Sequence, residues 1–394
     1  MKQRRRGKAP GGSEEWGAAM APGGSAEGGS GTPAVAIDPD IRRARTLPGS
    51  FYSDPAIHEA LRRVFARSWL FAGEEDDVRT PGSVHPTILL PGFLDEPLLF
   101  TRDQDDRVRC LSNVCTHRGM LVAESPGHVK TLRCRYHGRR FGLDGRCLGM
   151  PDFEEVAGFP SPADDLPSLL VERWANLLFT SLDPQTAFDE VMAPVSQRLD
   201  GVPLESLRPV PERSKDYLVH ANWALYCENF LESFHVPFVH AELARTLDYR
   251  TLEIELFEHG SVQVGLATEA DDAFEGLRSR AYAGREIVAF YFHIFPNLML
   301  NFYPWGLSLN VVEPLAIDRT RVRFRTFVHT PERLDRGAGA GLDRVEREDE
   351  EIVEAVQLGT RSRLYRLGRY SPTREPAVHH FHRALVRSLA RGAV

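Results

Sequence analysis

The chain has 394 residues, 42% of them hydrophobic and 26% charged, and its formal net charge is −7. This is the composition of a globular protein with room for two domains. The negative balance argues against a nucleic-acid-binding protein, and no apolar run is long enough to span a bilayer. Because five cysteines do not suggest a disulfide scaffold, we expect a cytoplasmic protein without a membrane segment.

The first 45 residues begin with a basic patch, Arg4-Arg5-Arg6, and continue rich in Gly, Ala, Ser and Pro. No apolar segment follows the basic patch, which argues against a secretory or twin-arginine signal. This composition buries too little apolar surface to fold, so we expect a disordered tail over residues 1–45.

Two patterns follow the tail. Apolar residues at helical spacing predict a helix over residues 54–69. From residue 83 to 170, short apolar runs alternate with Gly, Pro and Asp, which is typical of an all-β domain. Its clearest predicted strands cover residues 87–90, 98–101 and 129–132.

Residues 171–394 mix helices and strands. We expect a strand at 171–182 opening this second domain, a helix within 184–215, partial helix over 217–238 and a long helix within 333–364. A sheet covered by helices gives an α+β class. Six runs predict largely antiparallel strands: 252–256, 261–268, 286–292, 298–303, 307–314 and 321–330.

Two short segments of the first domain each pair one Cys with one His: Cys115 with His117, and Cys134 with His137. The set suits a soft metal, and three interpretations are open: zinc, a Rieske [2Fe–2S] cluster, or no metal. Zinc sites more often use CxxC and HxxxH spacings. In a Rieske centre two Cys hold one iron and two His hold the other, and one Cys and one His in each loop favours this interpretation.

Residues 228–240 carry a second candidate set. Glu232 and His235 are three residues apart, so a helix would present them on one face. Pro237 would break that helix and let His240 turn back toward His235.

A third ligand is available on the acidic helical segment 346–356, where Asp349 falls on the apolar stripe. A lone carboxylate on a buried face is costly unless it is paired or binds a metal. The alternatives are two histidines satisfied in the core and an Asp349 paired with an Arg. Two His and one carboxylate with open positions form the facial triad of non-haem Fe(II) oxygenases.

Both sets resemble the motifs of the Rieske non-haem iron oxygenases. The resemblance rests on Asn113-Val-Cys-Thr-His-Arg-Gly, on Cys134-x-Tyr-His-Gly, on the acid-x-x-His-x4-His spacing of 228–240 and on Asp349 in a Glu-Asp-x4-Glu context. It implies a Rieske domain over 46–170 and a helix-grip (Bet v1-like) catalytic domain over 171–394. The implied cluster ligands are Cys115, His117, Cys134 and His137, and the implied iron ligands are His235, His240 and Asp349.

The resemblance also implies partners. Glu232 would sit between a cluster His of one subunit and an iron His of the next, with Asn229 nearby, so a homotrimeric ring is expected. A separate flavin- or ferredoxin-type reductase would deliver electrons from NAD(P)H. The oxygenase would use these electrons and O2 to hydroxylate a small organic substrate.

The wording Glu-Asn-Phe-Leu-Glu-Ser-x-His at 228–235 resembles the branch that acts on choline, glycine betaine and carnitine. Aromatic side chains could hold a trimethylammonium group by cation–π attraction, although an aromatic stripe on strands is more often core. An aromatic ring-hydroxylating dioxygenase, a non-catalytic Rieske electron carrier and a zinc-stabilised binding module are the rival functions. The candidate pocket walls are Phe234, Phe238, Phe292, Phe302, Tyr303 and Trp305.

The cluster motif departs from the family's pattern at Arg135 and Arg139, where Pro and Trp are usual. These residues, with Arg140, could raise the cluster potential or dock an acidic ferredoxin, or could be ordinary surface residues. Met120 and Tyr136 stand where respiratory Rieske proteins have a disulfide, so no such bridge is expected.

Overall fold

The computed structural model describes residues 35–240, 249–267, 273–334 and 342–391. Most of the expected tail, residues 1–34, lies outside these ranges. Residues 35–45 do not belong to a disordered tail, because Ala44 is buried and Val35 and Ile37 pack against the main hydrophobic core. The tail boundary expected at residue 45 is therefore too late.

The predicted first helix is present as α1 (Pro55–Ala66). Asp54 caps it by accepting a hydrogen bond from the backbone N–H of Ala56 at 2.8 Å, and Pro55 occupies the first turn. Its apolar face, which includes Leu61 and Phe65, is buried in the core.

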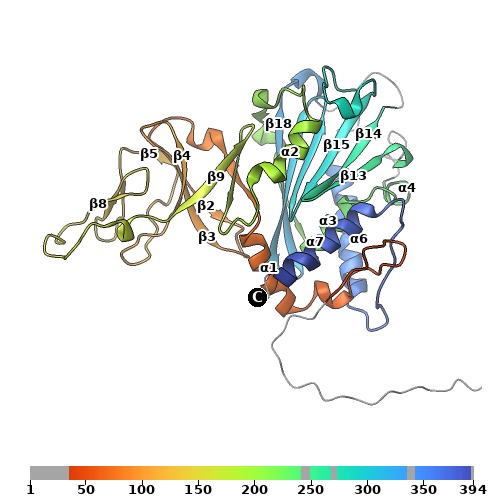
Figure 1. Cartoon of the computed structure of the whole chain (residues 1–394), viewed down its shortest axis with the longest axis horizontal. Helices are drawn as coiled ribbons and strands as arrows, with labels where there is room; N and C mark the ends of the chain where they lie inside the picture. The colour runs from red at the N-terminus through yellow and green to blue at the C-terminus, as the bar shows by residue number, and fades with distance from the viewer. Residues whose placement is uncertain (1–34, 241–248, 268–272, 335–341, 392–394) are drawn as a thin grey trace, which may run out of the picture. The chain divides into compact units, whose positions relative to one another are not determined.

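The first domain is built on a seven-stranded sheet in which the strands run β1-β10-β9-β4-β3-β2-β5, and each neighbouring pair is antiparallel (Figure 1). The prediction for residues 129–132 is wrong, because a connection rather than a strand occupies most of that run. The strands are β1 (Leu70–Glu74), β2 (Ser83–Leu89), β3 (Glu96–Arg102), β4 (Val108–Ser112), β5 (Gly127–His128), β9 (Ser168–Trp174) and β10 (Leu177–Ser181). A small sheet beside it contains β6 (Leu132–Arg133), β7 (Arg140–Phe141) and β8 (Cys147–Gly149).

The strand expected over residues 171–182 is a hairpin of β9 and β10, with Ala175 at its turn in a left-handed conformation (φ 51°). Because β10 pairs with β1 and β9 pairs with β4, the hairpin completes the first sheet. The domain boundary expected at residue 170 therefore moves beyond Ser181. Asn176, the second residue of this turn, favours turns, but it stands without a neighbouring Gly or Pro, and the turn was not predicted.

The second domain contains an eight-stranded antiparallel sheet ordered β11-β18-β17-β16-β15-β14-β13, with β12 also paired to β18. All six predicted strands are present. The strands are β11 (Arg208–Pro209), β12 (Lys215–Val219), β13 (Glu253–Phe257), β14 (Gly260–Leu266), β15 (Ile287–Ile294), β16 (Leu298–Tyr303), β17 (Gly306–Ala316) and β18 (Arg319–Val328).

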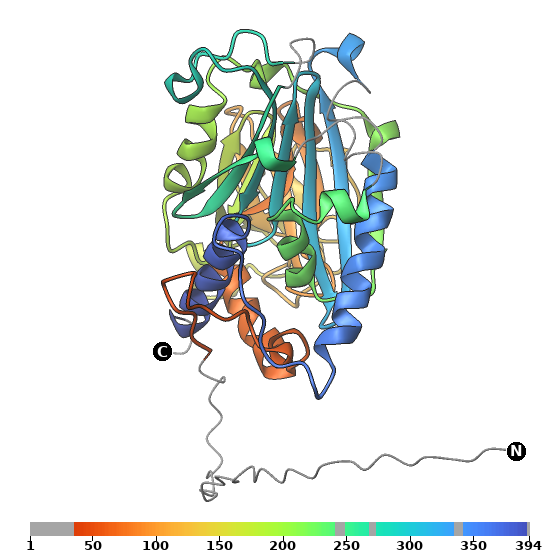
Figure 2. The same ribbon diagram turned by 90° about the vertical axis from the view of Figure 1, so that its right-hand side faces the viewer.

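Helices cover this sheet, as Figure 2 shows, and the domain has the expected α+β class. The last helix, α7, was not predicted. No helix of the described ranges is long and apolar enough to cross a membrane. The helices are α2 (Phe188–Arg198), α3 (Trp223–Phe230), α4 (Val236–Val239), α6 (Leu342–Thr360) and α7 (Pro376–Arg391).

The two faces of β15 and β16 have different roles. Even-numbered side chains, including Phe292 and Phe302, are buried in the core that also contains residues of α2. Odd-numbered side chains point the other way, since successive strand residues alternate between faces. Tyr291, Asn301 and Tyr303 therefore face the cavity described below.

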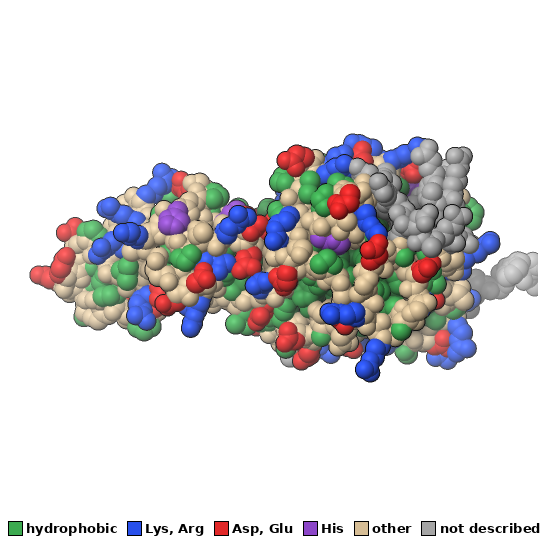
Figure 3. Space-filling model, turned by 90° about the horizontal axis from the view of Figure 1, so that it is seen from above, with side chains coloured by type: hydrophobic (Ala, Val, Ile, Leu, Met, Phe, Trp, Pro, Cys, Tyr) green, Lys and Arg blue, Asp and Glu red, His purple; other side chains and the backbone are tan. Residues whose placement is uncertain are grey.

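Acidic and basic side chains are interspersed over the face shown in Figure 3. The described side chains of that face offer no broad basic surface for a nucleic acid, in line with the negative net charge of −7.

Candidate functional site

The two Cys–His loops have the same backbone design. Gly119 N–H donates to the carbonyl of Cys115 at 2.9 Å, and Gly138 N–H donates to the carbonyl of Cys134 at 3.0 Å. Both glycines have a left-handed φ, 72° and 74°, which a residue with a Cβ rarely adopts. Each loop is thus a tight turn between strands, as the spacing predicted.

The loops bring the four predicted cluster ligands together. The Cys115 and Cys134 side chains are both buried, and burial raises the pKa of the Cys115 thiol, with a further contribution from Cys134 beside it. The rings of His117 and His137 lie 4.8 Å apart. Nδ1 of His137 is buried without a hydrogen-bond partner among the described residues, which suits a metal ligand. This donor set fits a [2Fe–2S] cluster.

Arg139 joins the two loops. Its side chain is 3% exposed, and its guanidinium pairs with Asp164 at 2.5 Å and donates to Thr116 Oγ1 at 3.1 Å. It also lies 5.0 Å from the ring centre of Phe159. Docking of an acidic ferredoxin was one of the roles considered for Arg139 from the sequence. Its buried side chain cannot make that contact. Arg135 is exposed and pairs with Glu124.

The iron-ligand candidates also converge, but by a different local structure from the one expected. Helix α3 ends at Phe230, before Glu232, and His235 precedes the one-turn helix α4. Pro237 lies in the first turn of α4 rather than at the end of a longer helix. The two histidines flank this single turn, which brings their imidazoles to the same side.

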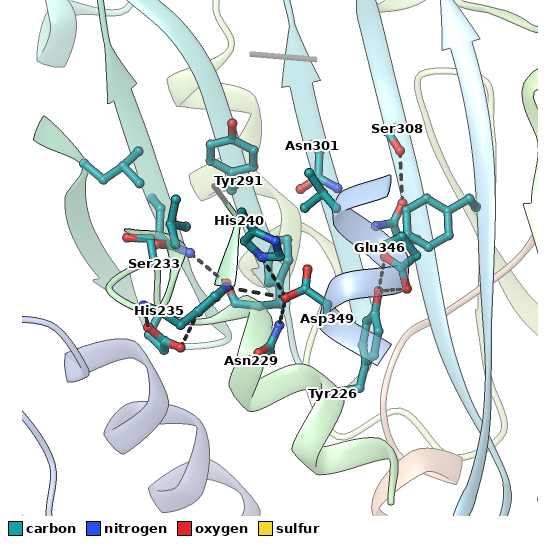
Figure 4. A pocket seen from close by; sticks show the side chains of 18 of the residues that line it. Tyr226, Asn229, Ser233, His235, His240, Tyr291, Asn301, Ser308, Glu346 and Asp349 are labelled. Atoms are coloured by element: carbon teal, nitrogen blue, oxygen red, sulfur yellow. Dashed lines mark hydrogen bonds and ion pairs between the residues drawn. The ribbon is translucent and has the colours of Figure 1, made fainter. Parts of the chain in front are cut away.

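Asp349 extends from α6 toward both imidazoles, as Figure 4 shows. Its Oδ1 lies 3.1 Å from Nε2 of His240 and 3.5 Å from Nε2 of His235. Within the described ranges, these three residues form the one group of His, Cys, Asp or Glu side chains whose ligand atoms all lie within 4.8 Å of one another. Two imidazoles and a carboxylate are the donor set that non-haem Fe(II) sites use.

The electrostatics of the three groups agree with that use. Burial alone would raise the pKa of Asp349, but hydrogen bonds from His235 and His240 outweigh it and lower the pKa. Burial would lower the pKa of His235, whereas Asp349 and Glu232 raise it to about 9. The side chains thus hold a buried carboxylate ionised at a point where cationic charge is favoured.

A carboxylate holds the outer nitrogen of each imidazole. Glu232 Oε1 lies 2.5 Å from Nδ1 of His235, and Glu348 Oε2 lies 2.7 Å from Nδ1 of His240. These contacts favour the Nδ1–H tautomer and leave Nε2 directed at Asp349, as in carboxylate–histidine–metal sites. Asn229 donates its side-chain N–H to Asp349 Oδ1 at 2.7 Å. The sequence analysis gave Glu348 no role, because only Asp349 was predicted to lie on the apolar stripe of this segment.

A cavity of about 150 Å³ adjoins the triad. Of the six aromatic walls expected, only Tyr303 lines it. Phe292 and Phe302 are on the opposite face of the sheet, Trp305 stacks behind Tyr303 with ring centres 5.1 Å apart, and Phe238 is 84% exposed. Aromatic walls that sequence reasoning missed are Tyr226, Phe230, Tyr291 and Phe324, and polar walls include Gln263, Asn301, Ser308, Asn310 and Glu346.

Comparison with known proteins matches both halves of the chain. Residues 68–160 match the Rieske [2Fe-2S] domain, and residues 204–391 match the ring hydroxylating alpha subunit (catalytic domain).

Relatives match along most of their length. Choline monooxygenase, chloroplastic, of Arabidopsis thaliana is 29% identical over 370 residues, covering 88% of this chain and 84% of that protein. The carnitine monooxygenase oxygenase subunit of Escherichia coli (strain K12) is 26% identical over 365 residues, covering 87% and 94%. A crystal structure of the quaternary ammonium Rieske monooxygenase CntA superimposes with a TM-score of 0.72 at 21% identity, covering 89% of this chain and 96% of that one.

The two matched domains occur in the order that the sequence motifs predicted. Both carry the ligand types that their chemistry needs, on loops and helices that bring them together. The chain belongs to the Rieske non-haem iron oxygenases, as an oxidoreductase α subunit of the ring-hydroxylating family that resembles the choline and carnitine monooxygenases.

Proposed function

We propose that this oxygenase hydroxylates a small quaternary or N-methylated amine, with electrons from a separate NAD(P)H-dependent reductase. The observation that carries the proposal is the composition of the cavity wall. Tyr226, Tyr291 and Tyr303 line it beside the buried carboxylate of Glu346, and the described lining residues include no Lys or Arg.

The aromatic walls suit a cation that has no N–H to donate. A trimethylammonium group cannot form ordinary hydrogen bonds, so its recognition depends on ring faces and on opposite charge. Each well-placed ring contributes about 0.5–2 kcal/mol. The names of the relatives, choline and carnitine monooxygenases, support the same substrate class.

The reaction has a simple balance. One atom of O2 enters a C–H bond of the amine to give C–OH, and the other leaves as water with two electrons and two protons. The iron that His235, His240 and Asp349 would hold supplies O2 activation, and the cluster supplies stored electrons. Glu232, Glu348 and Asn229 orient the three ligands, and the tyrosine walls place the amine beside them.

Electron delivery between subunits is part of the proposal. Glu232 contacts His235 through Nδ1, and its side chain is 13% exposed. A cluster histidine of a neighbouring subunit could reach the other side of this carboxylate in a homotrimeric ring. Inter-subunit electron transfer is described for the structure of a quaternary ammonium Rieske monooxygenase that has this fold. We further propose a cytoplasmic location, because none of the five cysteines forms a disulfide.

Substrate-dependent turnover with a surrogate reductase tests the function. We expect amine-dependent consumption of NADH and O2, with an aldehyde product: formaldehyde if an N-methyl group is attacked, or the amine's own aldehyde if a carbinol carbon is attacked. The control is a panel of aromatic acids. Turnover of an aromatic acid with none of any amine would show that the chain is an aromatic-ring dioxygenase instead. Iron-replete protein that oxidises neither class would support an electron carrier.

A further inference from the structure

We propose that Glu346 is the anionic anchor of the cavity, and that it selects a monocationic quaternary amino alcohol over a zwitterionic amino acid. This inference rests on the proposed function and narrows it from quaternary amines in general to one charge type.

Glu346 is buried at the cavity wall without a basic partner. Its residue is 6% exposed, and Tyr226 OH lies 2.7 Å from both carboxylate oxygens. In the described ranges no Lys, Arg or His forms an ion pair with it. A buried carboxylate with one neutral partner is costly, and burial raises the pKa of Glu346 well above its ordinary value. A cation in the adjoining cavity would remove that cost and keep the carboxylate ionised.

The charge around the triad leaves Glu346 available for the substrate. Glu232 and Glu348 bind the outer nitrogens of the two imidazoles, and Asp349 faces their inner nitrogens. These three carboxylates carry a charge of −3, which already exceeds the +2 of a divalent iron. Glu346 contacts neither imidazole, so its charge is not used by the metal site.

Two acceptor oxygens in the cavity wall receive no hydrogen bond from the described residues. Gln263 donates its side-chain N–H to the carbonyl of Phe230 at 2.8 Å, which fixes the amide orientation. Its Oε1 and the Oδ1 of Asn301 are buried and accept no hydrogen bond within the described ranges. Both residues line the cavity. A ligand hydroxyl can donate to such oxygens, since leaving them unsatisfied is unfavourable.

A zwitterion fits this wall poorly. Its carboxylate would meet acceptor oxygens and the like charge of Glu346, and no described Lys or Arg lines the cavity to compensate. Discrimination of this kind works through a repulsive contact as well as an attractive one. The wall therefore favours an alcohol over an acid at the far end of the amine.

Equilibrium binding to the iron-loaded, full-length protein under anaerobic conditions tests the inference without relying on turnover. Calorimetry would compare three ligands of similar shape: choline, its neutral isostere with carbon in place of nitrogen, and glycine betaine. We expect wild type to bind choline at least about tenfold more tightly than either of the others. Glu346→Gln should reduce the preference for choline over the isostere by about tenfold, while affinity for the neutral isostere changes by less than about twofold.

Glu351→Gln on the same helix is the matched control, because Glu351 is exposed and the substitution removes the same charge. An unchanged choline-to-isostere ratio in Glu346→Gln would overturn the inference, as would wild type that binds betaine as tightly as choline. If Glu346→Gln does not fold, the wild-type ratios decide. Failure of every quaternary amine to bind or turn over would instead refute the proposed function.

Discussion

The carboxylate of Glu232 holds Nδ1 of His235 at 2.5 Å, and its second oxygen accepts the backbone N–H of His235 at 3.2 Å. One acidic side chain thus fixes both the ring and the backbone of an iron-ligand candidate. The same side chain is the one proposed to receive electrons from a neighbouring subunit. Orientation and electron transfer are therefore separable roles of Glu232, and they require different measurements.

Replacing Glu232 by Gln should slow electron transfer more than it affects iron binding. We expect single-turnover oxidation of the reduced cluster, in the presence of substrate and O2, to slow by at least about tenfold. Iron affinity should fall by no more than in Glu348→Gln, which makes the same change at the other imidazole, so the rate is measured on protein loaded with excess iron. Glu232→Asp tests whether the charge alone restores the rate. Wild-type oxidation kinetics in Glu232→Gln would contradict the electron-transfer role.

Replacing Asp349 by Ala should remove one metal and spare the other. We expect the iron content to fall from about three to about two per chain, because the cluster ligands lie on a different domain. The visible and electron spin resonance spectra of the cluster should persist, and substrate-dependent O2 uptake should vanish. Retention of the third iron would show that Asp349 is not a ligand.

Glu348→Gln tests an orienting contact that the sequence did not reveal. Loss of the charge that holds Nδ1 of His240 should lower iron affinity or turnover by about 10–100-fold. Iron retention during chelator titration is the measurement, with Glu351→Gln as the control of equal charge. Equal chelator sensitivity of the two variants would mean that the Glu348 contact does not stabilise the site.

Arg139→Gln should loosen the cluster loops. The substitution leaves Asp164 without its ion-pair partner and removes the hydrogen bond to Thr116 between the two loops. We expect the visible absorbance of the [2Fe–2S] cluster to bleach at a lower temperature than in wild type. We also expect the reduction potential of the cluster to shift in a redox titration. Arg135→Gln, at an exposed position near the same loops, is the control. If both variants bleach like wild type, Arg139 does not join the loops energetically.

His293 should make the second domain acid-sensitive. Burial lowers the pKa of His293 to about 3, far below the usual value of 6.5. As the pH falls below 6.5 the unfolded chain binds this proton first, so stability is lost between pH 6.5 and about 3. At pH 5 the loss from this residue is about 2 kcal/mol relative to neutral pH.

His293→Gln removes that titration and can still donate to the Pro296 carbonyl, which lies 3.2 Å from the His293 ring. The variant starts less stable, because it loses ring packing on Phe381. Urea unfolding at pH 7 and pH 5 should nevertheless show a smaller acid-induced loss in the variant than in wild type. Parallel losses would mean that His293 is accessible to protons in the folded chain.

Local patterns were sufficient for the cluster loops and most strands. Cys, His and Gly at fixed offsets specify a tight turn whatever surrounds it, which is why Cys115 and Cys134 could be assigned roles from spacing. The hairpin of β9 and β10 was missed because Asn176 is the only typical turn residue between its two strands. Helix α7 was missed although the sequence carries its signal: Val378, Phe381 and Leu385 recur at helical spacing after Pro376.

Side-chain contacts within the site were harder to foresee. Ile352 and Val356 belong to the apolar stripe that was predicted to face the core on α6. They are 37% and 44% exposed, whereas Glu346 and Gln357 are buried. The packed face is thus partly polar, satisfied by Tyr226 and by the backbone N–H of Asn222. Apolar spacing placed Asp349 on the packed face, where Val353 is also buried, but it missed the polar members of that face, which hydrogen bonds hold there.

Glu346 and Asp349 are one turn apart on α6, a single helix of 19 residues. A helix moves nearly as a rigid rod, so a small roll that follows neutralisation of one carboxylate also displaces the other. Binding of a cationic amine beside Glu346 would thereby also affect the position of Asp349. A change in the position of this helix would therefore alter the proposed substrate anchor and the iron-ligand candidate together.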